Sequence, residues 1–229
     1  MMQPEGQNEQ GAQATELPSI GSPIAKTAWH WFDFICPFCY VARSRNEILN
    51  RSGLIIVKVP FQAHPGIPTG GVTVGPRSGE MYDRLEREAY DAGLPLRWPS
   101  RLPNSRYALA VAEWVRRHHS EGFTTLYHQL FLSHFSLGED IGDTTLVNSY
   151  AEQAGVDLDL VQGAISDGSA DAAVAESEAA AHRIGIAGTP GWLIENHVVF
   201  GLHDKGLFRQ VAHEVADHTR DEKDPRGQL

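Results

Sequence analysis

The first strong hydrophobic pattern covers residues 28–59. Aromatic and apolar side chains fill Ala28–Phe34 (AWHWFDF), which predicts a strand ending just before Cys36. Apolar positions then recur at helical spacing until Gly53, which is expected to end the helix. The next segment, Leu54–Val59 (LIIVKV), is a nearly continuous β-branched run, as in a buried strand. These patterns predict a strand–helix–strand unit.

A long and mostly helical region is expected next. Residues 64–79 are rich in Gly and Pro and are predicted to form a loop. Several stretches with apolar side chains at three- and four-residue spacing follow, and their aromatic residues are interpreted as core positions. Asn104, Asp143 and Asp157 precede such stretches and are predicted to cap helices. The helical insertion is therefore placed at about residues 62–168.

The pattern changes again after this region. An alanine-rich helix is predicted over about 169–184 and is followed by two short strands, Gly191–Ile194 and His197–Phe200, joined by a tight turn. A final amphipathic helix carries Leu207 and Val211 on one face. The full order is β-α-β, then helices, then α-β-β-α, which belongs to the α/β class.

Composition separates the two ends of the chain from its centre. Residues 1–26 contain few large apolar side chains and are predicted to be a disordered tail. Residues 217–229 are charged and are expected to form a solvated tail. One folded domain is therefore predicted over residues 27–216.

Charge and hydropathy argue against two classes of partner. The net charge of −10 and the lack of a long basic run disfavour nucleic-acid binding. No apolar run approaches the roughly 20 residues that a membrane-spanning helix needs. The first residues have neither the basic nor the apolar segment of a secretory signal peptide, so a cytoplasmic location is expected.

Cys36-Pro37-Phe38-Cys39 carries the strongest chemical signal, because the chain has only these two cysteines. The motif lies where a strand meets a helix, and backbone N–H groups at a helix start favour a thiolate. Cys36 is expected to be the exposed attacking thiol, and Cys39, one turn later, the resolving thiol. Pro37 suits the first helical position, and Phe38 adds no charge.

A second motif, Gly188-Thr189-Pro190-Gly191, directly precedes the predicted strand at Gly191–Ile194. Together with the first motif it makes the chain resemble the DsbA-like family of thioredoxin-fold oxidoreductases. Within that family it is similar to the FrnE-like branch, which is related to 2-hydroxychromene-2-carboxylate isomerases. The matching segments are FDFICPFCYVARSRNEIL, VPFQAHPGIP, LPNSRYALAVAEW, LFLSHFSLGEDIGDTTLVNSYAEQAGVDLDLV and GIAGTPGWLI.

The resemblance implies a thioredoxin fold with a large all-helical insertion. It also implies that Pro190 is a cis-proline facing the cysteine pair, with Thr189 placed to pair with a bound substrate. FrnE-like proteins commonly have Asn where this chain has His64, and usually another residue where it has Phe38. Both departures bear on substrate choice.

The function expected from these features is thiol–disulfide exchange with a protein or glutathione-like partner. No bound cofactor or metal is expected, and glutathione would serve as a co-substrate. One alternative is a glutathione-dependent isomerase or kappa-class glutathione transferase-like enzyme, a group that typically has serine at the position of Cys36. Another is a non-redox zinc-binding or interaction module, for which the isolated histidines offer no second paired motif. Those histidines are His64, His134, His182, His197 and the pair His118-His119, the last expected to face solvent.

Overall fold

The structure is a computed structural model that describes residues 27–221, with side chains described as far as residue 215. The elements follow the chain in the order β1 (Thr27–Phe32), α1 (Pro37–Val41), α2 (Arg43–Arg51), β2 (Ile55–Pro60), β3 (Val72–Thr73), α3 (Glu80–Asp91), β4 (Arg101–Leu102), α4 (Arg106–His118), α5 (Ser120–Leu132), the π-helix η2 (Ser133–Leu137), α6 (Thr144–Gln153), α7 (Leu158–Ser166), α8 (Ser169–Arg183), β5 (Gly191–Ile194), β6 (His197–Phe200) and α9 (Lys205–Asp221).

A four-stranded mixed sheet with the order β2-β1-β5-β6 forms the centre of the molecule. β1 runs parallel to β2 and antiparallel to β5, and β5 and β6 form an antiparallel hairpin. The α-helical unit between β1 and β2 provides the crossover that a parallel pair requires. The α/β class predicted from the order of elements and the thioredoxin fold that the resemblance implied are therefore confirmed.

Both faces of the sheet are covered, so every residue of β1 is buried. On one face the indole N–H of Trp31 donates to a backbone oxygen of α8, that of Ser177, over 3.1 Å. On the other face Trp192 contacts the edge of Phe208 from α9, and its indole N–H donates to Asn46 of α2 over 2.9 Å. These contacts place α8 on one side of the sheet and α2 with α9 on the other.

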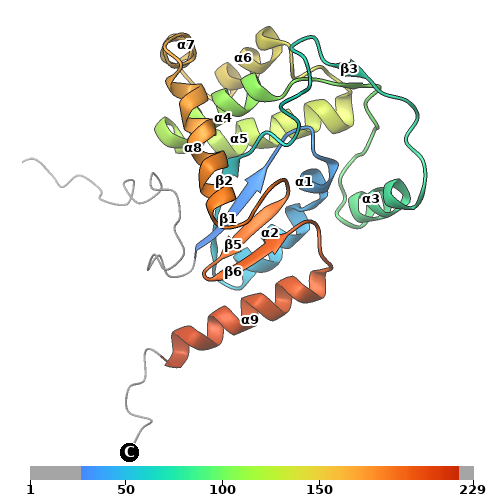
Figure 1. Ribbon diagram of the computed structural model, residues 1–229, viewed down its shortest axis with the longest axis vertical. Helices are drawn as coiled ribbons and strands as arrows, with labels where there is room; N and C mark the ends of the chain where they lie inside the picture. Colours follow the sequence, from blue (N-terminus) through green and yellow to red (C-terminus); the bar gives the residue numbers. More distant parts are fainter. Residues whose placement is uncertain (1–26, 222–229) are drawn as a thin grey trace, which may run out of the picture.

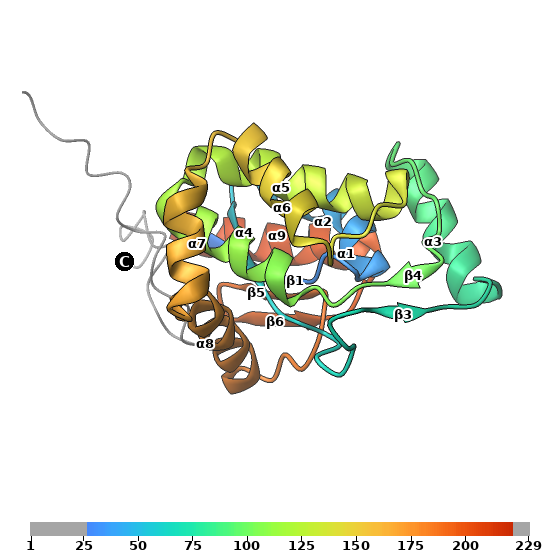
Figure 2. The ribbon, with the colours of Figure 1, turned by 90° about the horizontal axis from the view of Figure 1, so that it is seen from above.

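The insertion lies at one end of the sheet. Helices α4 to α7 group above the strands, while α9 lies at the opposite end and α3 stands to the side (Figure 1). β3 and β4 run side by side towards α3 (Figure 2) and pair antiparallel through Val72 and Leu102. The expectation of an all-helical insertion is therefore wrong in this detail. The sequence pattern did not reveal β3 and β4, because two-residue strands are too short to produce an alternating pattern.

Helix caps were predicted with mixed accuracy. Asp143 and Asp157 are the N-caps of α6 and α7, and each side chain accepts the N–H two residues on, as predicted. The N-cap of α4 is Ser105 rather than Asn104, although the Asn104 side-chain oxygen accepts the Arg106 N–H over 2.9 Å. The capping oxygen therefore comes from one residue earlier than the cap position itself.

Only part of the predicted C-terminal tail can be compared with the structure. Residues 1–26 lie outside the described residues, as do residues 222–229. α9 continues to residue 221, beyond residue 217 where a tail was expected. Charged residues occur both in tails and in exposed helical turns, so composition could not place this boundary.

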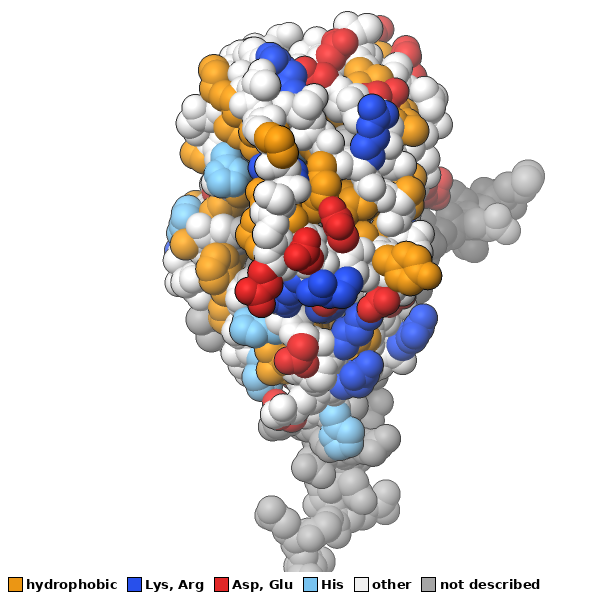
Figure 3. Space-filling model, turned by 90° about the vertical axis from the view of Figure 1, so that its right-hand side faces the viewer, with side chains coloured by type: hydrophobic (Ala, Val, Ile, Leu, Met, Phe, Trp, Pro, Cys, Tyr) orange, Lys and Arg blue, Asp and Glu red, His pale blue; other side chains and the backbone are white. Residues whose placement is uncertain are grey.

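Charge is mixed on the face that carries α3. Acidic and basic side chains are interspersed there, with hydrophobic side chains exposed between them (Figure 3). Among the described residues no helix is both long and apolar enough to cross a membrane.

Candidate functional site

The cysteine motif forms the junction between β1 and α1. β1 ends at Phe32, two residues earlier than predicted, because the chain turns at Asp33, whose carbonyl accepts the Cys36 N–H over 3.1 Å. Cys36 is the N-cap of α1 with extended backbone angles, and the first helical position is Pro37. The Cys36 carbonyl then accepts the N–H of Cys39 over 3.0 Å. Both thiols thus lie at the N-terminal end of one helix.

The second motif lies beside the first, because β5, which follows it, pairs with β1. The Sγ of Cys36 lies 3.4 Å from the backbone oxygen of Thr189, a residue 153 positions later in the chain. The Thr189–Pro190 peptide bond is cis. The carbonyl of Thr189 therefore lies against the sulfur of Cys36, and a hydrogen bond with Thr189 also acts on the acidity of this thiol.

Exposure differs from the expectation for the attacking thiol. Cys36 was expected to be exposed, but only 8% of it is accessible, against 2% for Cys39. Cys36 is buried because its contact with Thr189 covers the sulfur, while Pro37 and Phe38 remain half-buried beside it. Cys36 is still the more accessible of the two thiols.

The two thiols have opposite acidity. Burial acts to raise the pKa of Cys36, but hydrogen bonds with Cys39 and Thr189 outweigh it, so the pKa of Cys36 is lowered. Burial raises the pKa of Cys39 well above its ordinary value, and the hydrogen bond to Cys36 and the charge of Cys36 act in the same direction. Cys36 therefore ionises first, and Cys39 stays protonated beside it.

Asp33 is a site residue that the sequence reasoning did not identify. Its side chain is fully buried, and burial raises its pKa to about 6. One carboxylate oxygen accepts the N–H of Ile35 over 3.2 Å, and the other accepts the N–H of Ala63 over 2.9 Å. Its negative charge acts to raise the pKa of Cys36. The available signal was a charged residue inside the otherwise apolar run FDFIC.

The histidines considered as ligands do not gather at the cysteines. His64 is exposed and acts through its charge on Asp33. His119, which was expected to face solvent, instead caps α5 by accepting the N–H of Gly122 over 3.1 Å. His134 is fully buried in η2. Within residues 27–221, no group of three or more His, Cys, Asp or Glu side chains is placed to hold a metal ion.

A curated relative and several solved structures are similar to this chain. A 2-hydroxychromene-2-carboxylate isomerase from Sphingobium xenophagum is 24% identical over 187 residues, which cover 78% of this chain and 93% of the isomerase. A probable DsbA oxidoreductase from Streptomyces coelicolor has a TM-score of 0.72 at 22% identity, over 89% of this chain and 93% of that one.

Another similar structure is the cytosolic disulfide reductase DsbM from Pseudomonas aeruginosa, solved with GSH. Its TM-score is 0.57 at 18% identity, over 86% of this chain and 98% of that chain. At these identities the structural likenesses establish the fold. The model of the DsbA-like thioredoxin domain matches residues 29–211, which is most of the sequence and includes both motifs. The chain therefore belongs to the family of DsbA-like thioredoxin domains.

Proposed function

We propose that this protein is a thiol–disulfide oxidoreductase in which Cys36 attacks and Cys39 resolves. The observation that carries the proposal is the pair of free thiols at the start of α1, with the pKa of Cys36 lowered and that of Cys39 raised. The thiolate is the nucleophile in disulfide exchange, so the thiol that ionises first is the attacking one.

The reaction proceeds in two exchanges. The Cys36 thiolate attacks one sulfur of the substrate disulfide, forming a mixed disulfide and releasing the other substrate sulfur, which takes up a proton. Cys39 then loses its proton and attacks Cys36 Sγ, which releases the second substrate thiol. Two electrons pass from the cysteine pair to the substrate, and the pair ends as a disulfide.

Thr189 and Pro190 are proposed to hold the substrate against Cys36. The backbone N–H of Thr189 donates to no backbone acceptor within residues 27–221, while the carbonyl of Pro190 is already occupied by the N–H of Gly201 at 2.8 Å. An extended substrate segment can therefore pair with Thr189, as in other cases where a peptide adds to a free backbone edge.

Glutathione is the proposed electron donor. The similar reductase from Pseudomonas aeruginosa is described as cytosolic and was solved with GSH. Two glutathione molecules would return the Cys36–Cys39 disulfide to the dithiol, forming one glutathione disulfide. A cytoplasmic location is proposed on the same basis, since a reducing pool favours the reductase or isomerase direction.

The test is exchange of the purified protein with reduced and oxidised glutathione, followed by mass spectrometry. Wild type is expected to form an intramolecular disulfide reversibly, and Cys39→Ser to accumulate one glutathione adduct at Cys36. Cys36→Ser is expected to form at least tenfold less adduct, because the pKa of Cys39 is raised. Thiols that resist oxidation in wild type would contradict the proposal.

A second candidate is a glutathione-dependent isomerase, which the relative from Sphingobium xenophagum favours. In that case bound glutathione would supply the nucleophile, and the second cysteine would be dispensable. Cys39→Ser separates the two candidates: it should keep isomerase turnover of a chromene carboxylate but lose catalytic disulfide reduction.

A further inference from the structure

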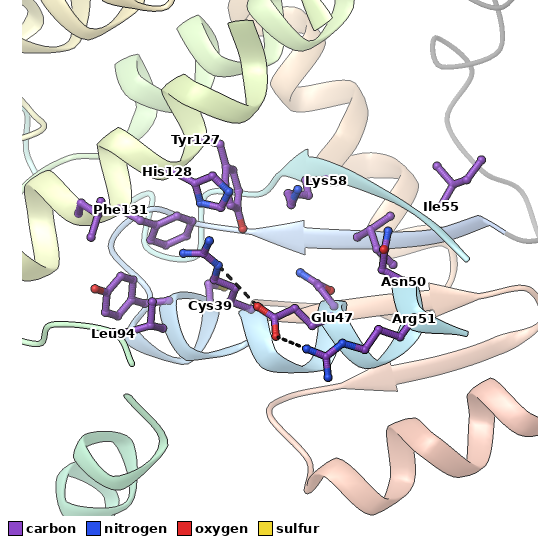
Figure 4. Close-up of a pocket in the computed structure, with 15 residues that line it drawn as sticks. Cys39, Glu47, Asn50, Arg51, Ile55, Lys58, Leu94, Tyr127, His128 and Phe131 are labelled. Atoms are coloured by element: carbon purple, nitrogen blue, oxygen red, sulfur yellow. Dashed lines mark ion pairs between the residues drawn. The ribbon is translucent and has the colours of Figure 1, made fainter. Parts of the chain in front are cut away.

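A separate pocket opens between α2, β2 and α5, beside the buried Cys39 (Figure 4). Its volume of about 450 Å³ lies within the range of small-molecule sites. Cys36, Thr189 and Pro190 do not line it. The pocket is therefore distinct from the edge at which the disulfide substrate is proposed to bind.

Basic side chains from different elements converge on this pocket. Lys58 enters from β2 and His128 from α5 (Figure 4), and Arg43 lines it from α2. Lys58 forms no ion pair with any described residue; its ammonium lies over the Tyr127 ring, 4.9 Å from the ring centroid. Glu47 contributes a carboxylate to the lining, but it is half exposed and pairs with Arg43 at 3.9 Å and with Arg51 at 3.7 Å.

Burial disfavours the charged forms of Lys58 and His128, so a negatively charged ligand beside them would stabilise both. Burial lowers the pKa of Lys58, and the charge of Arg43 lowers it further. Burial lowers the pKa of His128 to about 4, and Arg43 and Lys58 act in the same direction. The titratable and charged groups that line the pocket around His128 are Arg43, Glu47 and Arg51 of α2, Lys58 of β2, Cys39 and Tyr40 of α1, and Tyr127 of α5.

A buried donor without a partner adjoins the same pocket. Asn46, which lines it, accepts the indole N–H of Trp192 through its oxygen, so its amide nitrogen donates to His30 Nδ1 over 3.0 Å. The ring hydrogen of His30 is then on Nε2, which has no hydrogen-bond partner among the described residues. Burial lowers the pKa of His30 to about 3, and the charge of Lys58 acts in the same direction. The ring N–H of His30, behind the pocket, therefore has no hydrogen-bond acceptor among the described residues.

Most of the remaining wall is apolar, although Asn50 also lines it. Phe131 and Leu94 line the end near Cys39, and the ring of Tyr40 stacks on that of Phe135 behind them. A bare inorganic anion would leave this apolar surface against water, whereas an organic acid would cover it and place its carboxylate by the cations.

We propose that the pocket binds a small organic acid, with its carboxylate beside Lys58 and His128 and its apolar body against Phe131 and Leu94. The site does not depend on disulfide exchange. Because the carboxylate adds a negative charge next to His128, binding raises the pKa of His128 and takes up protons. Affinity therefore increases as the pH falls from the raised, bound-state pKa of His128 towards its free value of about 4.

The test is a titration with benzoate, observed through the ring nitrogens of ¹⁵N-labelled histidines, with His128 assigned from a His128→Gln spectrum. Benzyl alcohol is the neutral probe of the same shape, and inorganic phosphate is the anion without an apolar body. Lys58→Gln and Arg43→Gln each remove one cation from the pocket. Arg209→Gln removes an exposed cation of α9 outside it and serves as the matched control.

Benzoate is expected to shift the His128 signals and raise its pKa in wild type, Arg209→Gln and Cys36→Ser alike. Lys58→Gln should bind roughly tenfold more weakly or worse, since it removes a charge-assisted contact. Arg43→Gln, on an exposed helix surface, should weaken binding several-fold and covers the case in which Lys58→Gln fails to fold. Equal binding of benzyl alcohol, or unchanged affinity in both variants, would overturn the site, and equal binding of phosphate would overturn the ligand class. Cys36→Ser keeps this result separate from the redox proposal.

Discussion

At the scale of single residues, Asp33 links the turn before Cys36 to the segment after β2. Its two oxygens hold the N–H groups of Ile35 and Ala63, and its pKa of about 6 lies above that of an unfolded carboxyl. The folded protein therefore binds this proton more tightly than the unfolded chain. The free energy of unfolding consequently decreases as the pH rises from about 4 to about 6, by roughly 3 kcal/mol from this group.

Asp33→Asn should remove this pH dependence. Urea unfolding at pH 4 and pH 7 is expected to show that the variant gains roughly 2–3 kcal/mol relative to wild type between the two pH values. Its absolute stability also reflects one lost amide contact, worth roughly 1–3 kcal/mol, because an Asn side chain keeps one accepting oxygen. The pKa of Cys36, read from the pH dependence of alkylation in a Cys39→Ser background, should fall because a neighbouring negative charge is gone. A stability difference that is constant with pH would contradict the raised pKa of Asp33.

At the scale of elements, a buried arginine joins α2 to α3 and to the segment before α9. Arg45 is fully buried; it donates to the Glu88 carboxylate over 2.7 Å and to the His203 carbonyl over 2.8 Å. The hydrogen bond from Arg45 lowers the pKa of Glu88. This contact positions α3, which otherwise stands to the side of the sheet (Figure 1).

Glu88→Ala should destabilise the fold by roughly 3 kcal/mol at pH 7, because it leaves the Arg45 charge buried without its carboxylate. The pKa of Glu88 is lower in the folded state, so its stabilisation is complete above the unfolded pKa, near 4.3, and is lost as the pH falls through the folded value. Urea unfolding at pH 7 and pH 3 measures both effects. Glu47→Ala is the control, since its ion pairs are exposed and worth about 1 kcal/mol or less. Equal losses in the two variants would show that Arg45 does not depend on Glu88.

At the scale of the whole molecule, local patterns predicted the four strands of the central sheet and the position of the cysteine motif. β5 and β6 have the bounds expected from their alternation and turn, and Cys36 lies at the predicted strand–helix junction. These features depend on neighbouring residues, so a sequence window contains the needed information. The short pair β3–β4 and the π-helix η2 carry no such periodic signal.

Burial and the pocket could not be read from the sequence for a physical reason. Asp33 is compatible with an exposed turn until Ala63, thirty residues later, supplies its second N–H. Lys58 and His128 are far apart in the chain and meet only when β2 packs against α5. The pKa values of these groups depend on burial and on neighbouring charges in three dimensions. The spacing of residues along the chain does not give those neighbours.

The ionisation of Cys36 also makes the stability of the whole reduced protein depend on pH. Its pKa is lower in the folded state than in the unfolded chain, so the reduced fold gains stability as the pH rises from the folded value towards about 8.5. The difference in unfolding free energy between reduced wild type and Cys36→Ala should therefore increase from pH 6 to pH 8.5. In a Cys39→Ala background the increase should be smaller, because the foremost interaction that lowers the pKa of Cys36 is its hydrogen bond with Cys39. Urea unfolding of all four proteins under a non-thiol reductant gives this double-mutant cycle. An increase of the same size with and without Cys39 would mean that the helix start and Thr189 alone stabilise the thiolate.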